Sequence, residues 1–119
     1  MIQLKRVYAP AESRDGRRFL VERLWPRGMR KEELVMEGWL KAVAPSDGLR
    51  KWFGHDPAKW EEFQQRYASE LEGNSAAWEP LLAAARQGTV TLLYSSHDQE
   101  HNNALALKGF LDGRLEQQK

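Results

Sequence analysis

Residues 89–95 read TVTLLYS, and this stretch decides the fold. Apolar and β-branched residues run through it without the strict alternation of a half-exposed strand. Such a run is typical of a strand that is covered on both faces, as the inner strands of parallel sheets are. Helical patterns precede and follow it, so the sequence predicts an α/β protein.

Three helices are expected between residues 46 and 88. Ser46 is a good N-cap for a short first helix that ends near Gly54. Asp56 caps the second helix, and Pro57 suits its first position. Its apolar residues recur every three or four positions and line one face: Trp60, Phe63, Tyr67 and Leu71. Ser75 is expected to cap the third helix, which ends at Gly88.

Two further strands are expected in the first part of the chain, at residues 2–8 and 18–24. The loop between them is short for a helical crossover, so the sequence leaves the pairing of these two strands open. Strand 18–24 and strand 89–95 are separated by helices, which predicts parallel pairing through a right-handed crossover. A last helix follows, with Asp98 as its expected cap.

We expect a single α/β domain over residues 1–119, with a short, mostly parallel sheet of about three strands covered by helices. A chain of 119 residues fits one core, and its hydrophobic content of 41% argues against disorder. The sequence has no cysteine, no signal-peptide pattern and no apolar run long enough to span a membrane. Disulfides, Cys-based zinc sites and a thiolate nucleophile are therefore excluded, and a cytoplasmic protein is expected.

The net charge of +1 hides an uneven distribution. Residues 1–60 carry 13 Lys and Arg against 8 Asp and Glu, whereas residues 61–119 carry 5 against 9. A basic half can meet an anionic partner even when the whole chain is nearly neutral. The alternative is that the acidic half simply contains solvated helices.

Ligands of open α/β sheets bind beyond the carboxyl ends of the strands. Two polar segments are expected there, RLWPRG at 23–28 and YSSHDQEHNN at 94–103. Arg23 and Arg27 offer forked donors for a phosphate or carboxylate, and the helix N-terminus after the second segment favours an anion. The candidate ligand-binding residues are Arg23, Trp25, Arg27, Gly28, His55, Tyr94, Ser95 and Asn102.

Structural roles for the same residues stay open as alternatives. Arg23 can instead pair with Glu22 of a neighbouring turn or with Asp98. Trp25-Pro26 reads as a rigid exit from the strand, and the sequence leaves its cis or trans state open. Asn102 and its neighbour Asn103 either hydrogen-bond the preceding loop or touch a ligand.

HDQEH at 97–101 matches a zinc-peptidase pattern, and we reject it. If Asp98 is an N-cap, His97 lies outside the helix and the two imidazoles do not share a face. Few residues follow in which a third ligand could be found, so no metal and no other cofactor is expected.

LRKWFGHDPAKW at 49–60 interleaves aromatic and basic residues, a combination that can bind nucleic acid. Core packing of its aromatic residues is the favoured interpretation. His55 is expected to be a cap or hydrogen-bonding residue, with general acid or base chemistry as the minority alternative.

Three stretches together resemble a known family: VERLWPRG (21–28), APSDGLRKWFGHDPAKWEEFQQRYASEL (44–71) and TVTLLYSSHDQEHNNALALKGFL (89–111). They are similar to the YeaO-like proteins of the domain-of-unknown-function 488 family, over nearly the whole chain. The resemblance implies a small bacterial α/β protein without an established activity.

The chain departs from the pattern of other branches of that family, which carry Cys-x-Glu and Cys-His-Arg motifs around the last strand and helix. Ser95 and Ser96 stand where the first of these falls, and HNNA stands at the second. The departure leaves two interpretations. Either this branch has lost a chemistry and kept a binding pocket, or it uses His101, Asp98 and Tyr94 differently.

Three functions are therefore weighed. The first is a binding module for a phosphate-bearing small molecule or nucleic acid. The second is a small enzyme acting on a nucleotide or nucleic-acid base or sugar, with Glu22 or Asp98 as acid or base and His101 or His55 as proton carrier. The third is a protein-interaction regulator that uses aromatic residues around Trp39 and Trp52. No membrane partner is expected, and the oligomeric state is left open.

Overall fold

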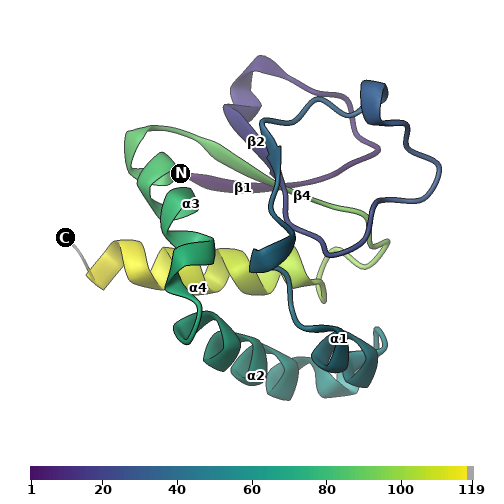
Figure 1. Cartoon of the computed structure of the whole chain (residues 1–119), viewed down its shortest axis with the longest axis vertical. Coiled ribbons are helices and arrows are strands. Elements are labelled where there is room, and N and C mark those ends of the chain that lie inside the picture. Colours follow the sequence, from purple (N-terminus) through teal and green to yellow (C-terminus); the bar gives the residue numbers. More distant parts are fainter. Residues whose placement is uncertain (118–119) are drawn as a thin grey trace.

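The computed structural model of the chain describes residues 1–117. Its centre is a four-stranded, wholly parallel sheet in the order β1-β4-β2-β3 (Figure 1). The strands are β1 (Ile2–Arg6), β2 (Arg17–Leu20), β3 (Gly38–Trp39) and β4 (Val90–Tyr94). All five residues of β4 are buried, as TVTLLYS predicts. The α/β prediction and the parallel pairing of β2 with β4 are both confirmed.

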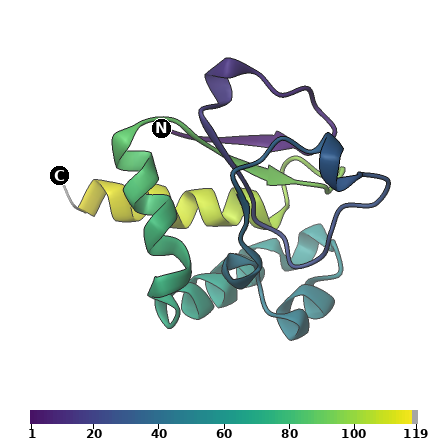
Figure 2. The ribbon, with the colours of Figure 1, turned by 45° about the horizontal axis from the view of Figure 1, so that its top comes forward.

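Four helices lie on one side of the sheet, as Figures 1 and 2 show. They are α1 (Asp47–Phe53), α2 (Trp60–Glu72), α3 (Ser75–Gln87) and α4 (Asn103–Gln117). Helix α4 lies against β1 and β4, and α2 packs on α4. The predicted face of α2 is buried at Phe63, Tyr67 and Leu71. No helix within residues 1–117 is long and apolar enough to cross a membrane.

Loops cover the opposite side of the sheet. The strands alternate accordingly: Phe19 and Leu92 belong to the main core under the helices, whereas Leu20 and Leu93 belong to a second apolar cluster. Leu34 and neighbouring side chains from residues 25–39 complete this second cluster. The sheet is therefore buried on both faces although the helices occupy only one.

The chain connects β1 to β2 through residues 7–16, which cross over β4. This answers the question that the sequence leaves open, because β1 and β2 are both parallel to β4 and do not pair with each other. The return from β3 to β4 runs in the opposite direction along the sheet, through the helices on the other face. The two connections run in opposite directions on opposite faces of the sheet, so both have the right-handed crossover that parallel strands prefer.

Several predicted boundaries need correction. Strand β2 ends at Leu20 rather than at residue 24, and β3 adds a fourth, two-residue strand that the sequence did not indicate. Asn74, not Ser75, precedes α3 as its cap residue. Asp98 does not cap α4, because Asn102 Oδ1 accepts the hydrogen bond from the backbone N–H of Leu105.

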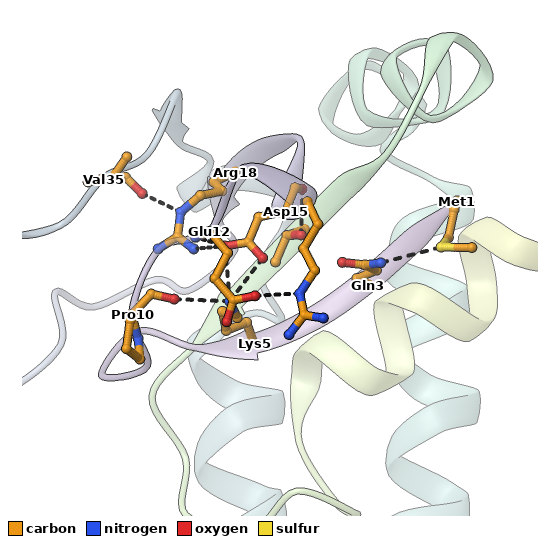
Figure 3. A network of polar contacts seen from close by, with 10 residues as sticks. Met1, Gln3, Lys5, Pro10, Glu12, Asp15, Arg18 and Val35 are labelled. Carbon is orange, nitrogen blue, oxygen red and sulfur yellow. Dashed lines mark hydrogen bonds and ion pairs between the residues drawn. The ribbon is translucent and has the colours of Figure 1, made fainter.

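A buried ionic network fixes the β1–β2 connection (Figure 3). The side chain of Asp15 is 2% exposed, and its carboxylate accepts hydrogen bonds from Lys5 Nζ at 2.9 Å and from the backbone N–H of Glu12 at 3.0 Å. Arg18, itself 6% exposed, donates to the same carboxylate. Arg18 Nε also donates to the carbonyl of Val35 at 2.7 Å, which fastens the second covering loop to the first.

The backbone next to Asp15 approaches β4 closely. Thr91 Oγ1 donates to the carbonyl of Asp15 at 2.7 Å, and Arg17 N donates to the carbonyl of Thr89 at 3.0 Å. Gly16 has φ of +64°, and a Cβ atom there would lie 2.2 Å from the Thr89 oxygen. Glycine is required at this position both for its left-handed backbone and for the space.

We expect Asp15→Ala to lower the free energy of unfolding by about 3–5 kcal/mol, because it leaves the buried Arg18 without a carboxylate and removes the shorter of the two ion pairs of Lys5. Urea unfolding followed by circular dichroism measures the change. The matched control is Glu37→Ala, which breaks the exposed Arg17–Glu37 pair and should cost less than about 1 kcal/mol. Equal effects of the two variants would contradict the structural role of Asp15.

The same network predicts an acid transition. Burial alone would raise the pKa of Asp15, but hydrogen bonds from Lys5, the Glu12 backbone and Arg18 outweigh burial and lower the pKa to about 2, from 3.8. The stabilisation is thus complete above pH 3.8 and is lost as the pH falls towards about 2. Asp15→Ala should remove this part of the acid unfolding profile.

Candidate functional site

The carboxyl ends of β1, β4 and β2 meet at one edge of the sheet and are joined there by hydrogen bonds. Arg6, the last residue of β1, donates from Nη2 to the Ser95 carbonyl at 3.1 Å and from Nε to the Ser96 carbonyl at 2.9 Å. Ser95 Oγ donates to Glu22 Oε2 at 3.0 Å. The sheet thus brings an arginine, a serine and a glutamate from three strand ends into one row.

The guanidinium of Arg6 is held by neutral groups only. Within residues 1–117, no carboxylate lies within 4 Å of it, and its remaining close partner is His97 Nδ1 at 3.4 Å. Its positive charge is fixed in position but not neutralised by an acid. Sequence reasoning missed this residue. The available signal was a charged side chain at the end of a strand whose alternate residues, Ile2 and Leu4, face the core.

A cavity of about 350 Å³ opens beside Arg6. The end of β1, Tyr8, Tyr94 of β4 and Gln99 from the loop before α4 line it. Burial raises the pKa of the Tyr94 phenol, and the nearby Arg6 charge only partly offsets this, so the hydroxyl is protonated at neutral pH and can donate a hydrogen bond. Tyr94, one of the ligand-binding residues predicted from the sequence, thus lines this cavity with a hydroxyl that can donate.

Tyr8 forms a fixed, exposed wall of the cavity. Its hydroxyl donates to the carbonyl of Arg27 at 2.8 Å, and the Arg6 guanidinium lies 4.9 Å from its ring centroid. The side chain is nevertheless 45% exposed. The sequence predicted Arg27 as an anion ligand, but its observed hydrogen bond uses the backbone carbonyl.

Arg23 is held differently from the prediction. Its Nε and Nη2 donate to the carbonyls of Pro45 at 3.0 Å and Ala44 at 3.2 Å, and Asp47 lies 3.8 Å away. It pairs with neither Glu22 nor Asp98, and it is not among the residues that line the cavity. These bonds join the segment after β2 to the segment before α1, and the ligand-binding role of Arg23 stays a prediction.

The segment after Arg23 also has structural contacts. Trp25 packs edge-on against Trp39 with ring centroids 5.2 Å apart and donates from Nε1 to the Met29 carbonyl. The Trp25–Pro26 peptide bond is trans, and Gly28 has φ of +73° in an exposed turn. The ligand-binding roles of Trp25, Arg27 and Gly28 stay predictions, and none of the three lines the cavity.

Glu22 is the least satisfied polar group of the edge. Oε2 accepts from Ser95, but Oε1 is buried and has no hydrogen-bond partner within the described chain. Burial raises the pKa of the carboxyl above its usual 4.5, while the hydrogen bonds from Ser95 and the charge of His55 partly offset this effect. His55 is exposed and has φ of +59°, a backbone conformation that is unfavourable for a non-glycine residue.

The polar residues before α4 are used within their own turn. Asp98 accepts hydrogen bonds from the backbone N–H groups of Glu100 and His101, at 2.9 and 3.0 Å, and contacts His101 Nδ1 at 2.9 Å. These contacts, the Glu100 bond first, lower the pKa of Asp98. Asn102 is 3% exposed and bonds both to the Asp98 carbonyl and to the start of α4, so its structural interpretation is the one that the geometry supports.

The two histidines of HDQEH have separate partners. His97 lies beside Arg6, whereas His101 contacts Asp98 and the edge of Trp60, with ring centroids 5.5 Å apart. Residues 1–117 contain no group of three or more His, Asp or Glu side chains arranged to hold a metal.

The aromatic residues of stretch 49–60 pack on the protein itself. Phe53 stacks on Phe63 with centroids 4.4 Å apart, and Arg66 covers the Trp52 ring at 4.3 Å. Trp39, the other aromatic of the interaction hypothesis, is half-buried and donates from Nε1 to the Glu22 carbonyl. Core packing thus accounts for these rings.

We expect Glu22→Gln to raise the free energy of unfolding by about 1 kcal/mol at pH 8, because it removes a buried carboxylate with an unpartnered oxygen. Because the pKa of Glu22 is raised on folding, the wild-type protein is most stable below the usual value of 4.5 and loses stability as the pH rises through the folded-state pKa. The stability gain of Glu22→Gln over the wild-type protein should therefore vanish at pH 4. Urea unfolding at both pH values measures it.

Glu70→Gln is the matched control. Both oxygens of Glu70 are satisfied, by the backbone N–H of Ser46 at 2.9 Å and by its hydroxyl at 2.6 Å. This variant should lose stability at pH 8. A loss of similar size in Glu22→Gln would show that the Glu22 carboxylate is a structural requirement.

Comparison with known proteins places the chain in a family. The family model of the inactive DUF488-N3 subclade matches residues 1–119. YeaO, an uncharacterised protein of Escherichia coli K12, is 42% identical over 110 residues, which are 92% of this chain and 96% of YeaO. An uncharacterised protein of Mycobacterium tuberculosis H37Rv is 37% identical over 113 residues, 95% of each chain. No solved structure matches significantly. The chain therefore belongs to the DUF488 family, as a member similar to YeaO and to the inactive DUF488-N3 subclade.

Proposed function

We propose that the protein is a small binding module whose ligand carries a phosphate or a similar anion, held beyond the carboxyl ends of β1 and β4. The observation that carries the proposal is Arg6. It is a guanidinium at the rim of a cavity of about 350 Å³, and within residues 1–117 no carboxylate lies within 4 Å of it.

The electrostatics support this choice of ligand. A guanidinium that is bonded to carbonyls keeps its full charge, because the dipoles of Ser95 and Ser96 orient it without neutralising it. Nε and Nη2 are engaged, and the remaining N–H groups can meet an oxyanion. Lys5 also lines the cavity, but Asp15 and Glu12 compensate its charge. Arg6 is thus the cation that an anion would meet.

The proposed site lies at the edge of the sheet that the sequence predicts, the carboxyl ends of the strands, but its anion ligand is Arg6 instead of Arg23. Arg23 was expected to bind the anion, yet Arg23 lies outside the cavity lining and close to Asp47. A cytoplasmic location is part of the proposal, since a chain without cysteine fits a reducing compartment.

Catalysis by the expected acids is the less favoured function. Asp98 uses its carboxylate inside a turn, and Glu22 has one oxygen bonded to Ser95 and the other enclosed. The matching subclade is described as inactive, which agrees with a binding role. This arrangement does not support a mechanism in which an acid and a base face a common substrate.

The test is thermal unfolding at low salt with inorganic phosphate, ribose 5-phosphate and adenosine monophosphate. A ligand at 100 times its dissociation constant stabilises by about 2.7 kcal/mol, which moves the melting temperature of a chain of this size by several degrees. We expect the shift to disappear in Arg6→Ala.

Arg23→Ala is the matched control, because Arg23 is also a guanidinium held by two backbone carbonyls but lies away from the cavity. Each variant is compared with its own melting temperature without ligand. A shift that persists in Arg6→Ala and is lost in Arg23→Ala would overturn the placement and restore the site at residues 23–28.

A further inference from the structure

We infer that Tyr8 is a stacking platform for a nucleobase, so that the ligand of the Arg6 cavity is a nucleotide. This inference rests on the proposed function and narrows its ligand class from phosphate-bearing molecules to those that also carry an aromatic base. The phosphate would lie at Arg6, and the base would lie on the face of the Tyr8 ring that the Arg6 guanidinium does not cover.

The exposure of Tyr8 is unusual for this protein. It is the only Phe, Trp or Tyr in residues 1–117 that is classed as exposed, at 45%. It belongs to neither of the two apolar clusters that build the core. Burial in the core therefore does not account for an aromatic side chain at this position.

The ring is nevertheless held in place. The hydroxyl bonds to the carbonyl of Arg27 at 2.8 Å, and the Arg6 guanidinium lies 4.9 Å from the ring centroid. An exposed aromatic ring that is already ordered loses little conformational entropy when a ligand stacks on it. Rings used in this way bind bases of any sequence, because every base has a flat π-face.

The surroundings offer further contacts to such a ligand. Tyr8 and Arg6 are two residues apart and line the same open cavity of about 350 Å³. Tyr94 and Gln99 line it too, and neither the phenol of Tyr94 nor the side-chain amide of Gln99 makes a hydrogen bond among residues 1–117. These free polar groups can meet a sugar or the edge of a base.

The experiment compares the affinity of four probes by isothermal titration calorimetry: inorganic phosphate, ribose 5-phosphate, adenosine monophosphate and a 5′-phosphorylated deoxyadenosine tetranucleotide. We expect adenosine monophosphate to bind about tenfold more tightly than ribose 5-phosphate, the range of one base–aromatic stack. Tyr8→Leu should abolish this difference, so that the variant binds adenosine monophosphate no more tightly than ribose 5-phosphate.

Tyr8→Phe is the conservative variant. It keeps the ring and removes the hydrogen bond to Arg27, so adenosine monophosphate should retain most of its advantage over ribose 5-phosphate. Circular dichroism melting confirms that each variant is folded before titration. The tetranucleotide distinguishes a free nucleotide from the end of a nucleic-acid strand as the ligand. Tighter binding than that of adenosine monophosphate, lost in Tyr8→Leu, indicates the end of a nucleic-acid strand. Equal or weaker binding indicates a free nucleotide.

The outcomes distinguish this inference from the proposal on which it rests. Equal affinity of the wild-type protein for adenosine monophosphate and ribose 5-phosphate, both lost in Arg6→Ala, would overturn the stacking role and leave the anion site standing. An advantage that survives Tyr8→Leu would also overturn it. Binding of none of the probes would remove the proposed function itself.

Discussion

The buried carboxylate of Asp15 governs the face of the sheet that the helices leave uncovered. Lys5, Arg18 and a backbone N–H converge on it, and this convergence fixes the β1–β2 connection across β4. Arg18 then fastens the second loop through the Val35 carbonyl. Charged groups are retained in a protein interior only where hydrogen bonds satisfy them, and here one acid satisfies two bases from two segments. The network thus holds loops on this face of the sheet, where no helix covers it.

The candidate site depends on this arrangement. Because the loop is closed over β4, β1 lies parallel to β4, in register from Ile2 opposite Val90 to Arg6 opposite Tyr94. The two strands therefore end at the same level, and the last residue of β1 reaches the carbonyls of Ser95 and Ser96. Lys5, the residue before Arg6, bonds to Asp15 and also lines the Arg6 cavity, so the network and the cavity share a residue of β1.

Local patterns predicted the fold well and the site only in part. Capping chemistry predicted both ends of α1, and helical spacing predicted the buried face and the end of α2, because these signals lie within one turn of the chain. The start of α2 was predicted three residues early, because Asp56 caps a 3-10 turn at Pro57–Lys59 that precedes the helix. The two-residue strand β3 has too little sequence to carry a pattern. Asn102 displaced Asp98 as the cap of α4, because both are capping residues and only the course of the loop decides between them. Arg6 was not singled out from the sequence for a comparable reason, and the ligand-binding role of Arg23 stays a prediction. Arg6 ends β1 and Arg23 follows β2, and the contacts that distinguish the two arginines come from distant segments: the lining of an open cavity for Arg6 and the carbonyls before α1 for Arg23.

The acid and base that end the strands are kept apart by one serine, and this separation matters for binding. Ser95 receives Arg6 on its carbonyl and donates its hydroxyl to Glu22, so the two charged side chains share a residue without touching. A direct ion pair would neutralise Arg6 and remove its attraction for an anion. Burial also raises the pKa of Glu22, and the hydrogen bonds from Ser95 partly offset this effect. The sequence VERLWPRG thus places a carboxyl where a core disfavours it, and Ser95 holds that carboxyl apart from Arg6 of β1, as the proposed anion site requires.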